Sequence, residues 1–451
     1  MKQLKHQIKD IIYFLIALFI LVSCNQPTIT INDSNGVFSK TNAPVSASLK
    51  LSKEQKVAAK SGHLCIVEVS AKNGNEIPIQ FENVSDEGNS KFTFLMPDGN
   101  PGIRIFKLIE SKNKADKAIR TNIDAKTGQV IIAENDKNVL QYNYQTVYEK
   151  DVVRSKYIQH TEPKYSPVGG IYLEKYYKAH PGIKKDTVVT SQIYAVPRSD
   201  YIHPLFGLNG EMLTHDWPDT GHPHHRGIFW AWPEVMYGAG LGDIYALQRV
   251  FARPAGNINY ESGNVFAQII AENLWEWDNE PIVREVATIR VYRATPDKRI
   301  IDLTLNFIAL KDSVTIATRE TNRYGGLNVR LQSPDKQDIS YFTDKKEAKP
   351  QRAWSDLNGV FKGNNSVSGM IILQHADNPE YPGVWKDYPN MGWVQPTFPS
   401  PNTRYLLSKT EPLILRYRLI IYNGGKPDKK ILEESWDAYN LPEIPVVEIE
   451  K

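Results

Sequence analysis

Alternation of apolar and polar side chains runs through the larger, C-terminal part of this chain. Between residues 300 and 310 the sequence IIDLTLNFIAL directs Ile301, Leu303, Leu305 and Phe307 to one face and polar residues to the other. A period of two predicts a β-strand with one buried face. Further segments share this β-branched and aromatic content, and they lie at 265–277, 283–294, 313–321, 369–376 and 413–424. We therefore expect an antiparallel sheet assembly from about residue 146 onward.

These strands predict an all-β fold with two domains. The run of strands at 146–451 is too long for one immunoglobulin-sized sandwich, and two large stacked sheets, an antiparallel β-supersandwich, would accommodate it. Shorter alternating segments at 46–145 predict a small β-sandwich domain that precedes it. Only KKILEESWDAY (429–439) has a helical pattern, with a single turn expected at KEQKVAAKSG (53–62).

The first residues predict export. Three lysines precede an apolar run at 11–22, and LVSC then ends at Cys24. This order is typical of a lipoprotein signal peptide over residues 1–23, with Cys24 lipidated, although a plain signal peptide that contains a cysteine has the same pattern. The apolar run is shorter than the roughly 20 residues of a permanent membrane span. Residues 24–45 are polar and predict a flexible tether.

These features predict a lipid-anchored protein of the bacterial cell envelope. After Cys24 the tether has no acidic run, which favours a periplasm-facing protein over a surface-exposed one. Removal of the leader takes the formal net charge from +3 to +1, which argues against a nucleic-acid partner. Cys65 is the only other cysteine, so we expect no intramolecular disulfide.

Histidines concentrate in one short stretch. Five of the ten histidines fall between His203 and His225, and the core of this stretch reads THDWPDTGHPHHRG (214–227). Its prolines and glycines indicate a loop or strand edge. In an extended HPHH, His222 and His224 would share a face and could hold a divalent metal together with ligands from elsewhere.

Two other interpretations of these histidines stay open. An imidazole oriented by a carboxylate transfers protons near neutral pH, so the stretch also suits acid/base catalysis. Alternatively, the histidines satisfy backbone groups in a proline-rich loop. No cofactor is predicted, and the metal held by His222 and His224 is kept only as an alternative.

Aromatic residues surround this stretch in the sequence. Trp230 and Trp232 follow it directly, and VWKDYPNMGWV (384–394) adds Trp385 and Trp393. Aromatic rings stack on the apolar faces of sugars, so these residues favour a carbohydrate ligand. Packing of the same tryptophans between two sheets is the other interpretation.

The segment RSDYIHPLFGLNGEMLTHDWPDTGHPHHRGIFWAW (198–232) resembles the hallmark of a bacterial family catalogued as methane oxygenase PmoA-like. Supporting likenesses lie in GGLNVRL (325–331), HADNPEYPGVW (375–385) and LRYRLIIYNG (415–424). The resemblance implies a galactose-mutarotase-like supersandwich whose concave sheet binds a carbohydrate. It also implies that a histidine and a carboxylate exchange protons there.

We therefore expect a secreted lipoprotein enzyme that acts on carbohydrate by glycoside hydrolysis or β-elimination. A glycan-binding lipoprotein without activity is one alternative, and a metal-dependent oxidoreductase, as the family name suggests, is another. The expected catalytic residues are His222, His224, His225, Glu320 and Asp377. The expected substrate-binding residues are His203, Arg226, Trp230, Trp232, Arg330, His375 and Trp385.

Overall fold

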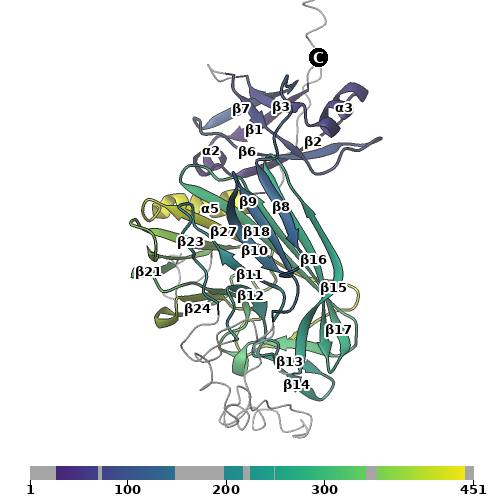
Figure 1. The fold of residues 1–451 in the computed structure, drawn as a ribbon, viewed down its shortest axis with the longest axis vertical. Helices are drawn as coiled ribbons and strands as arrows, with labels where there is room; N and C mark the ends of the chain where they lie inside the picture. The colour runs from purple at the N-terminus through teal and green to yellow at the C-terminus, as the bar shows by residue number, and fades with distance from the viewer. Residues whose placement is uncertain are drawn as a thin grey trace, which may run out of the picture. The chain divides into compact units, whose positions relative to one another are not determined.

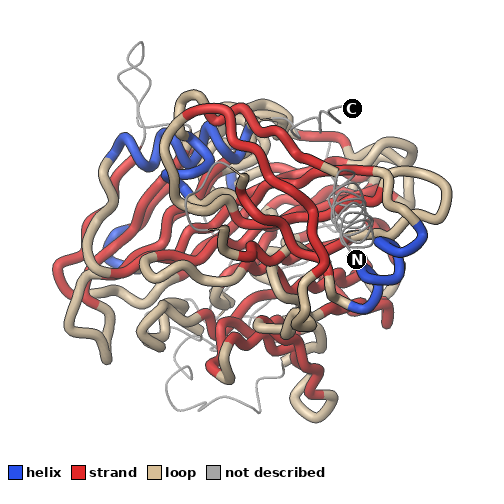
Figure 2. The backbone as a smooth tube through the Cα atoms, turned by 90° about the horizontal axis from the view of Figure 1, so that it is seen from above, coloured by secondary structure: helices blue, strands red, loops and turns tan. Residues whose placement is uncertain are grey.

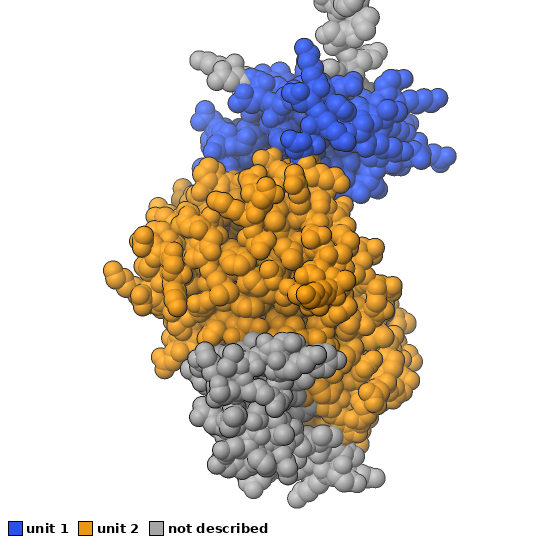
Figure 3. Space-filling model, in the orientation of Figure 1, with its two compact units in different colours: residues 1–116, 441–451 blue, residues 117–440 orange. Residues whose placement is uncertain are grey.

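The computed structural model describes residues 27–69, 74–147, 198–216, 224–247, 249–341 and 353–441. The chain divides into two compact units, residues 1–116 with 441–451 and residues 117–440 (Figure 3). The predicted signal peptide and Cys24 lie outside the described residues. Within the described residues, no helix combines the length and the apolar character needed to cross a membrane.

The described residues of the first unit form two small antiparallel sheets and two helices. One sheet has the order β1–β7–β3–β4 and the other β2–β6–β5. Buried rings of Phe92, Phe94 and Phe106 pack on one another in its core, with centroids 6.4 and 5.6 Å apart. The elements are β1 (Thr28–Asp33), α2 (Val37–Thr41), β2 (Pro44–Leu49), α3 (Lys53–Ser61), β3 (Leu64–Glu68), β4 (Glu76–Pro78), β5 (Gln80–Phe81), β6 (Ser90–Leu95) and β7 (Gly102–Glu110).

Two expectations for this part of the chain were wrong. Residues 28–49 form β1, α2 and β2 instead of a tether that extends to residue 45, because Ile29 and Ile31 alternate into the core and β1 pairs along its length with β7. The expected single turn at 53–62 is the helix α3, and Ser52 and Gln55 cap its first turn reciprocally.

The second unit is an antiparallel sandwich of two eight-stranded sheets, as predicted (Figures 1 and 2). Sheet I has the order β24–β25–β20–β12–β11–β10–β9–β8, and sheet II has the order β15–β16–β17–β18–β27–β23–β22–β21. The strands of sheet I are β8 (Ile119–Asp124), β9 (Gln129–Glu134), β10 (Lys137–Asn143), β11 (Tyr201–Leu205), β12 (Ile228–Ala231), β20 (Gly326–Arg330), β24 (Trp385–Tyr388) and β25 (Trp393–Pro396).

Sheet II contains the long alternating strands that the sequence predicts. They are β15 (Val250–Glu261), β16 (Phe266–Trp277), β17 (Glu280–Tyr292), β18 (Lys298–Ala309), β21 (Asp335–Tyr341), β22 (Trp354–Val360), β23 (Ser368–Gln374) and β27 (Leu413–Asn423). A third sheet contains β13 (Glu234–Tyr237), β14 (Gly240–Gly242), β19 (Val314–Ala317) and β26 (Tyr405–Leu406). Short 3₁₀ turns lie at η5 (Arg319–Thr321) and η6 (Pro389–Met391), and the predicted C-terminal helix is α5 (Lys429–Asn440).

The boundary between the units differs from the predicted one at residue 145. The strands β8, β9 and β10 belong to the second unit, because β10 pairs with β11 in sheet I, with Leu140 opposite Leu205. Short alternating strands have the same pattern in either domain, so local sequence does not reveal which sheet they join.

Candidate functional site

The two faces of sheet I have different chemistry. Trp230 lies opposite Leu327 in the register, and its indole donates a hydrogen bond of 2.7 Å to Glu285 of sheet II, so this face points into the core. The alternating neighbours Phe229 and Asn328 therefore point to the opposite, outer face. Pairing across sheet I places Tyr201, Arg330 and Trp393 on the same outer face.

Six residues gather on this outer face, and we call them the outer-face cluster: His224, His225, Tyr245, Tyr324, Arg330 and Trp393. The ring of His225 lies 5.1 Å from Trp393 and 5.6 Å from Tyr245, centroid to centroid. Tyr324 lies 5.0 Å from Tyr245 and 5.5 Å from Trp393. Tyr324 is only partly buried, so the cluster reaches the molecular surface there.

One contact in the outer-face cluster is suited to proton transfer. The hydroxyl of Tyr245 lies 3.4 Å from Nε2 of His225, and both side chains are buried. Burial raises the pKa of Tyr245 well above its ordinary value, so this phenol keeps its proton at neutral pH. The pair therefore combines an imidazole with a neutral acid.

Arg330 adds positive charge beside this pair. Burial lowers its pKa to about 10, and an electrostatic interaction with Tyr245 opposes that shift. The guanidinium therefore remains charged at neutral pH. Arg330 pairs with Trp393 in the register of β20 and β25, so the cation and the indole come from adjacent strands.

His224 lies beside His225, whereas an extended HPHH would direct the two side chains to opposite faces. Its ring lies 4.7 Å from that of His225 and 5.8 Å from that of Tyr245. His222 lies outside the described residues. In the parts of the chain that the structure describes, no group of three or more His, Cys, Asp or Glu side chains is arranged to hold a metal ion.

Arg226 and His203 lie near the outer-face cluster in the sequence, but each is held by its own polar partner. Arg226 is fully buried, forms a salt bridge with Asp216 and donates to the hydroxyl of Tyr201. Nδ1 of His203 lies 2.9 Å from the hydroxyl of Thr214, and burial lowers the pKa of His203. These contacts organise the segment from which His224 and His225 project.

Trp230 and Trp232, which the sequence predicts as ligand-binding residues, lie in the core. Both indoles are buried between the sheets, where Trp232 donates a hydrogen bond of 2.7 Å to the carbonyl of Phe398 and packs 5.5 Å from Trp275. Alternation on β12 sends Trp230 inward, and a fully buried indole needs an internal acceptor. Trp385 is also buried; it lies on the edge strand β24, and its ring packs 6.1 Å from that of Tyr341.

The expected partner carboxylates do not join the outer-face cluster. Glu320 lies in η5, where its ion pair is with Arg323. Asp377 is exposed and lies beside His375, whose ring packs 4.9 Å from Tyr439 of α5. Glu320 is therefore paired with Arg323, and Asp377 with His375, instead of with members of the outer-face cluster.

A buried pair of carboxyl groups, Asp200 and Glu285, lies on the inner side of sheet I. Their side chains are hydrogen-bonded to each other, and burial raises the pKa of both, that of Glu285 well above its usual range. Tyr142 donates to Asp200 at 2.7 Å. Trp230 and Trp275 each donate to one oxygen of Glu285 at 2.7 Å. Two buried carboxyl groups that are hydrogen-bonded to each other cannot both be ionised, so the pair holds a proton.

Sequence reasoning missed Tyr245 and this carboxyl pair. Tyr245 lies in LGDIYALQ, which has no motif, and Asp200 and Glu285 are 85 positions apart in the chain. Trp393 was grouped with other aromatic residues, but its place among them depends on the pairing of β25 with β20.

The fold is an all-β sandwich, and two histidines lie in the outer-face cluster on one of its sheets. A family model described as "Family of unknown function (DUF6807)" matches residues 184–437, and the chain belongs to this family. The predicted resemblance to the methane oxygenase PmoA-like family was therefore wrong. No curated protein matches the chain in a sequence comparison.

Proposed function

We propose that this chain is an enzyme that acts on a carbohydrate by acid/base catalysis at the outer-face cluster, with β-elimination as the favoured reaction. The contact of His225 with Tyr245, next to the cation of Arg330, is the observation that carries this proposal. Elimination from an acidic sugar requires a base, an acid and a cation for the carboxylate. These three residues match those requirements.

The proton balance of such a reaction can be assigned to this pair. His225 removes the proton from the carbon next to the sugar carboxylate, and that electron pair forms a carbon–carbon double bond. The bond to the glycosidic oxygen breaks, and Tyr245 gives its proton to the leaving oxygen. Return of the proton from His225 to Tyr245 across 3.4 Å restores both groups.

Arg330 and the aromatic rings would bind the sugar. A guanidinium pairs with a carboxylate through two parallel hydrogen bonds and stabilises the charge that develops on it. Tyr324, which is only partly buried, offers a ring face for the apolar side of a sugar. Hydrolysis usually requires two carboxyl groups, and the six members of the outer-face cluster include none, which favours elimination.

A panel of acidic and neutral polysaccharides tests the proposal. Elimination yields fragments that lack one water relative to hydrolysis products, and mass spectrometry distinguishes the two. We expect Tyr245→Phe and His225→Ala each to lower kcat by about 100-fold or more. His375→Ala is the control, because His375 contacts α5 and should leave turnover unchanged.

Two results would count against this function. Turnover that survives both Tyr245→Phe and His225→Ala on a confirmed substrate removes the acid/base assignment. Sugar binding without any product would instead indicate a glycan-binding protein.

We also propose that the chain is a lipid-anchored envelope protein, on the pattern LVSC that ends at Cys24. Replacement of Cys24 by Ser should move the expressed protein from the membrane fraction to the soluble fraction. A wild-type protein without the mass of attached acyl chains would contradict this.

A further inference from the structure

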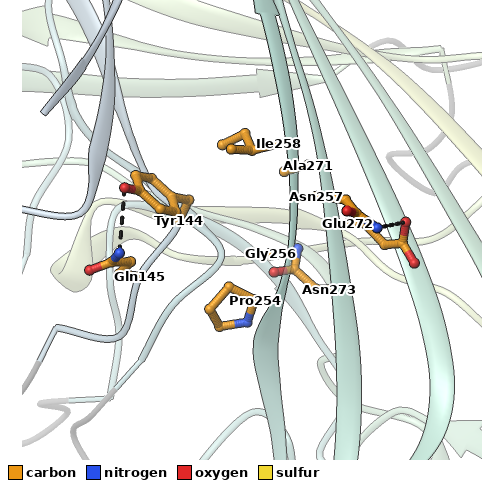
Figure 4. Close-up of a pocket in the computed structure, with 9 residues that line it drawn as sticks. All are labelled: Tyr144, Gln145, Pro254, Gly256, Asn257, Ile258, Ala271, Glu272 and Asn273. Atoms are coloured by element: carbon orange, nitrogen blue, oxygen red, sulfur yellow. Dashed lines mark hydrogen bonds between the residues drawn. The ribbon is translucent and has the colours of Figure 1, made fainter. Parts of the chain in front are cut away.

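Two features outside the outer-face cluster are open to a partner molecule. One is a pocket of about 140 Å³ in the second unit, lined by Tyr144, Ile258 and Ala271 among others (Figure 4). The side chains of Asn257 and Glu272 alternate to the other face of sheet II, so mainly apolar groups face Tyr144. The other feature, an apolar face of the first unit, lies beside a chain segment that indicates its partner.

The sheet β1–β7–β3–β4 of the first unit has one buried face and one face with exposed aliphatic side chains. The buried face includes Phe106, whose ring lies 5.6 Å from that of Phe94 in the other sheet. Alternation along β7 directs Ile103, Ile105 and Ile109 to the opposite face. Ile103 is 65 % exposed there, and the other two isoleucines are partly buried.

The neighbouring strand β3 extends this apolar face. Val67 lies opposite Lys107 in the register, and the backbone N–H of Val69 donates to the carbonyl of Ile105 at 2.8 Å. Val67 and Val69 therefore point to the same side as Ile105, and Val69 is 50 % exposed. We call these five residues the aliphatic face: Val67, Val69, Ile103, Ile105 and Ile109.

The composition of β7 is unusual for a strand that has one face in water. Such a strand ordinarily alternates apolar and polar residues, whereas a strand covered on both faces is apolar almost throughout. Of the four side chains that β7 directs to the aliphatic face, three are isoleucines and the fourth is Lys107. Adjoining exposed apolar side chains mark interaction sites with proteins or membranes.

The length of chain between Cys24 and β1 indicates which partner covers this face. Only residues 25–27 separate Cys24 from Thr28, the first residue of β1. Each residue of a chain spans at most about 3.6 Å, so the four steps from Cys24 to Thr28 reach roughly 14 Å. β1 is the edge strand directly beside β7, and Thr28 lies opposite Lys107. An acyl group on Cys24 would therefore hold this sheet next to the bilayer.

We propose that the aliphatic face docks on the phospholipid surface, with Ile103 and Val69 inserted between the lipid headgroups. This inference rests on the proposed acyl anchor at Cys24 and is independent of the proposed catalysis. Apolar side chains that reach the acyl boundary add to the membrane binding that an acyl anchor provides. Lys107 and Glu76 are exposed on the same side of the sheet with opposite charges, so burial of apolar side chains, and not attraction to anionic lipids, drives the docking.

A fluorescent label on the anchored protein tests this inference. The acylated protein is purified from the membrane fraction and reconstituted in phosphatidylcholine vesicles, and Ile103→Cys or Val69→Cys is labelled with the environment-sensitive fluorophore NBD. The introduced cysteine is the reactive one, because Cys24 carries the acyl group and burial raises the pKa of Cys65 to about 11. We expect the emission of either label to shift to shorter wavelength and to be quenched by lipids that carry a nitroxide on the acyl chain.

Val57→Cys is the matched control. Val57 is an aliphatic residue of similar exposure, 69 %, but it lies on α3, where Lys56 donates to the carbonyl of Asp86 in the loop before β6 of the other sheet. Its label should emit as in water and escape the nitroxide on the same vesicles. Ile103→Asp in the protein labelled at Val69→Cys should abolish the shift and the quenching while the acyl mass is kept, and both positions are exposed, so the fold stays intact.

Each outcome has a defined meaning. If the labels at positions 103 and 69 of the acylated protein are as exposed to water as the label at position 57, the docking is overturned while the anchor stands. Equal quenching at all three positions also overturns it, because the contact would then not be specific to the aliphatic face. A protein without the mass of acyl chains overturns the anchor and this inference together. Absence of an enzymatic product would remove the proposed catalysis alone.

Discussion

Replacement of Glu285 by Gln tests the buried carboxyl pair directly. The glutamine has the same shape, but it offers only one acceptor oxygen where Glu285 accepts from both Trp230 and Trp275. One indole N–H then lacks its acceptor inside the core. A buried donor without a partner costs about 1–3 kcal/mol. We therefore expect the free energy of unfolding at pH 5 to fall by about 1–3 kcal/mol.

The effect should depend on pH in a defined direction. Because burial raises the pKa of Glu285, the folded chain keeps a proton that the unfolded chain loses above its ordinary pKa. This contribution to stability is complete below the unfolded pKa and is lost as the pH rises toward the folded pKa. For one proton the slope is at most about 1.4 kcal/mol per pH unit. The glutamine side chain of the variant does not titrate, so the wild-type advantage should shrink between pH 5 and 7.

Urea unfolding followed by tryptophan fluorescence measures this difference. All nine tryptophans lie between residues 217 and 436, so the signal reports only on the second unit. The midpoint should shift while the dependence on urea concentration stays the same. Glu276→Gln is the control, a glutamate on the neighbouring strand β16 that should change stability by less than about 0.5 kcal/mol. If the free energies of unfolding of the wild type and Glu285→Gln differ by the same amount at every pH, Glu285 carries no extra proton in the folded chain. If the two proteins are equally stable at pH 5, the hydrogen bonds to the indoles are refuted.

Two further substitutions test the packing of sheet I. Gly227→Ala should destabilise the second unit by more than about 2 kcal/mol, since the added Cβ would collide with the carbonyl oxygen of Ile202. Gly238→Ala is its control, because Gly238 has a similar positive φ but open space around it, and comparable losses in both variants would dismiss the steric argument. Trp232→Ala should cost about 3–5 kcal/mol through the cavity it leaves and the lost bond to Phe398, whereas a loss below about 1 kcal/mol would contradict its place in the core. Urea midpoints at pH 7 measure all three.

Tertiary structure changed the interpretation of several predicted site residues. Trp230 and Trp232 have the composition of a sugar-binding surface, but alternation and the internal acceptors Glu285 and the Phe398 carbonyl place them in the core. An extended HPHH would separate the side chains of His224 and His225, but the structure brings both rings against Tyr245, which has no sequence signal. Whether these residues act on a sugar stays a prediction.

The sequence by itself determined the class of fold, because a period of two over long segments leaves β-strands as the arrangement that buries one face. It also determined the C-terminal helix, from a period that suits α5. It did not determine which sheet β8, β9 and β10 join, since pairing depends on partners far away in the chain. For the same reason only the tertiary structure brought Arg330 of β20 next to Tyr245, which lies in the turn after β14, and Asp200 next to Glu285 of the facing sheet. Neither pair leaves a local pattern in the sequence.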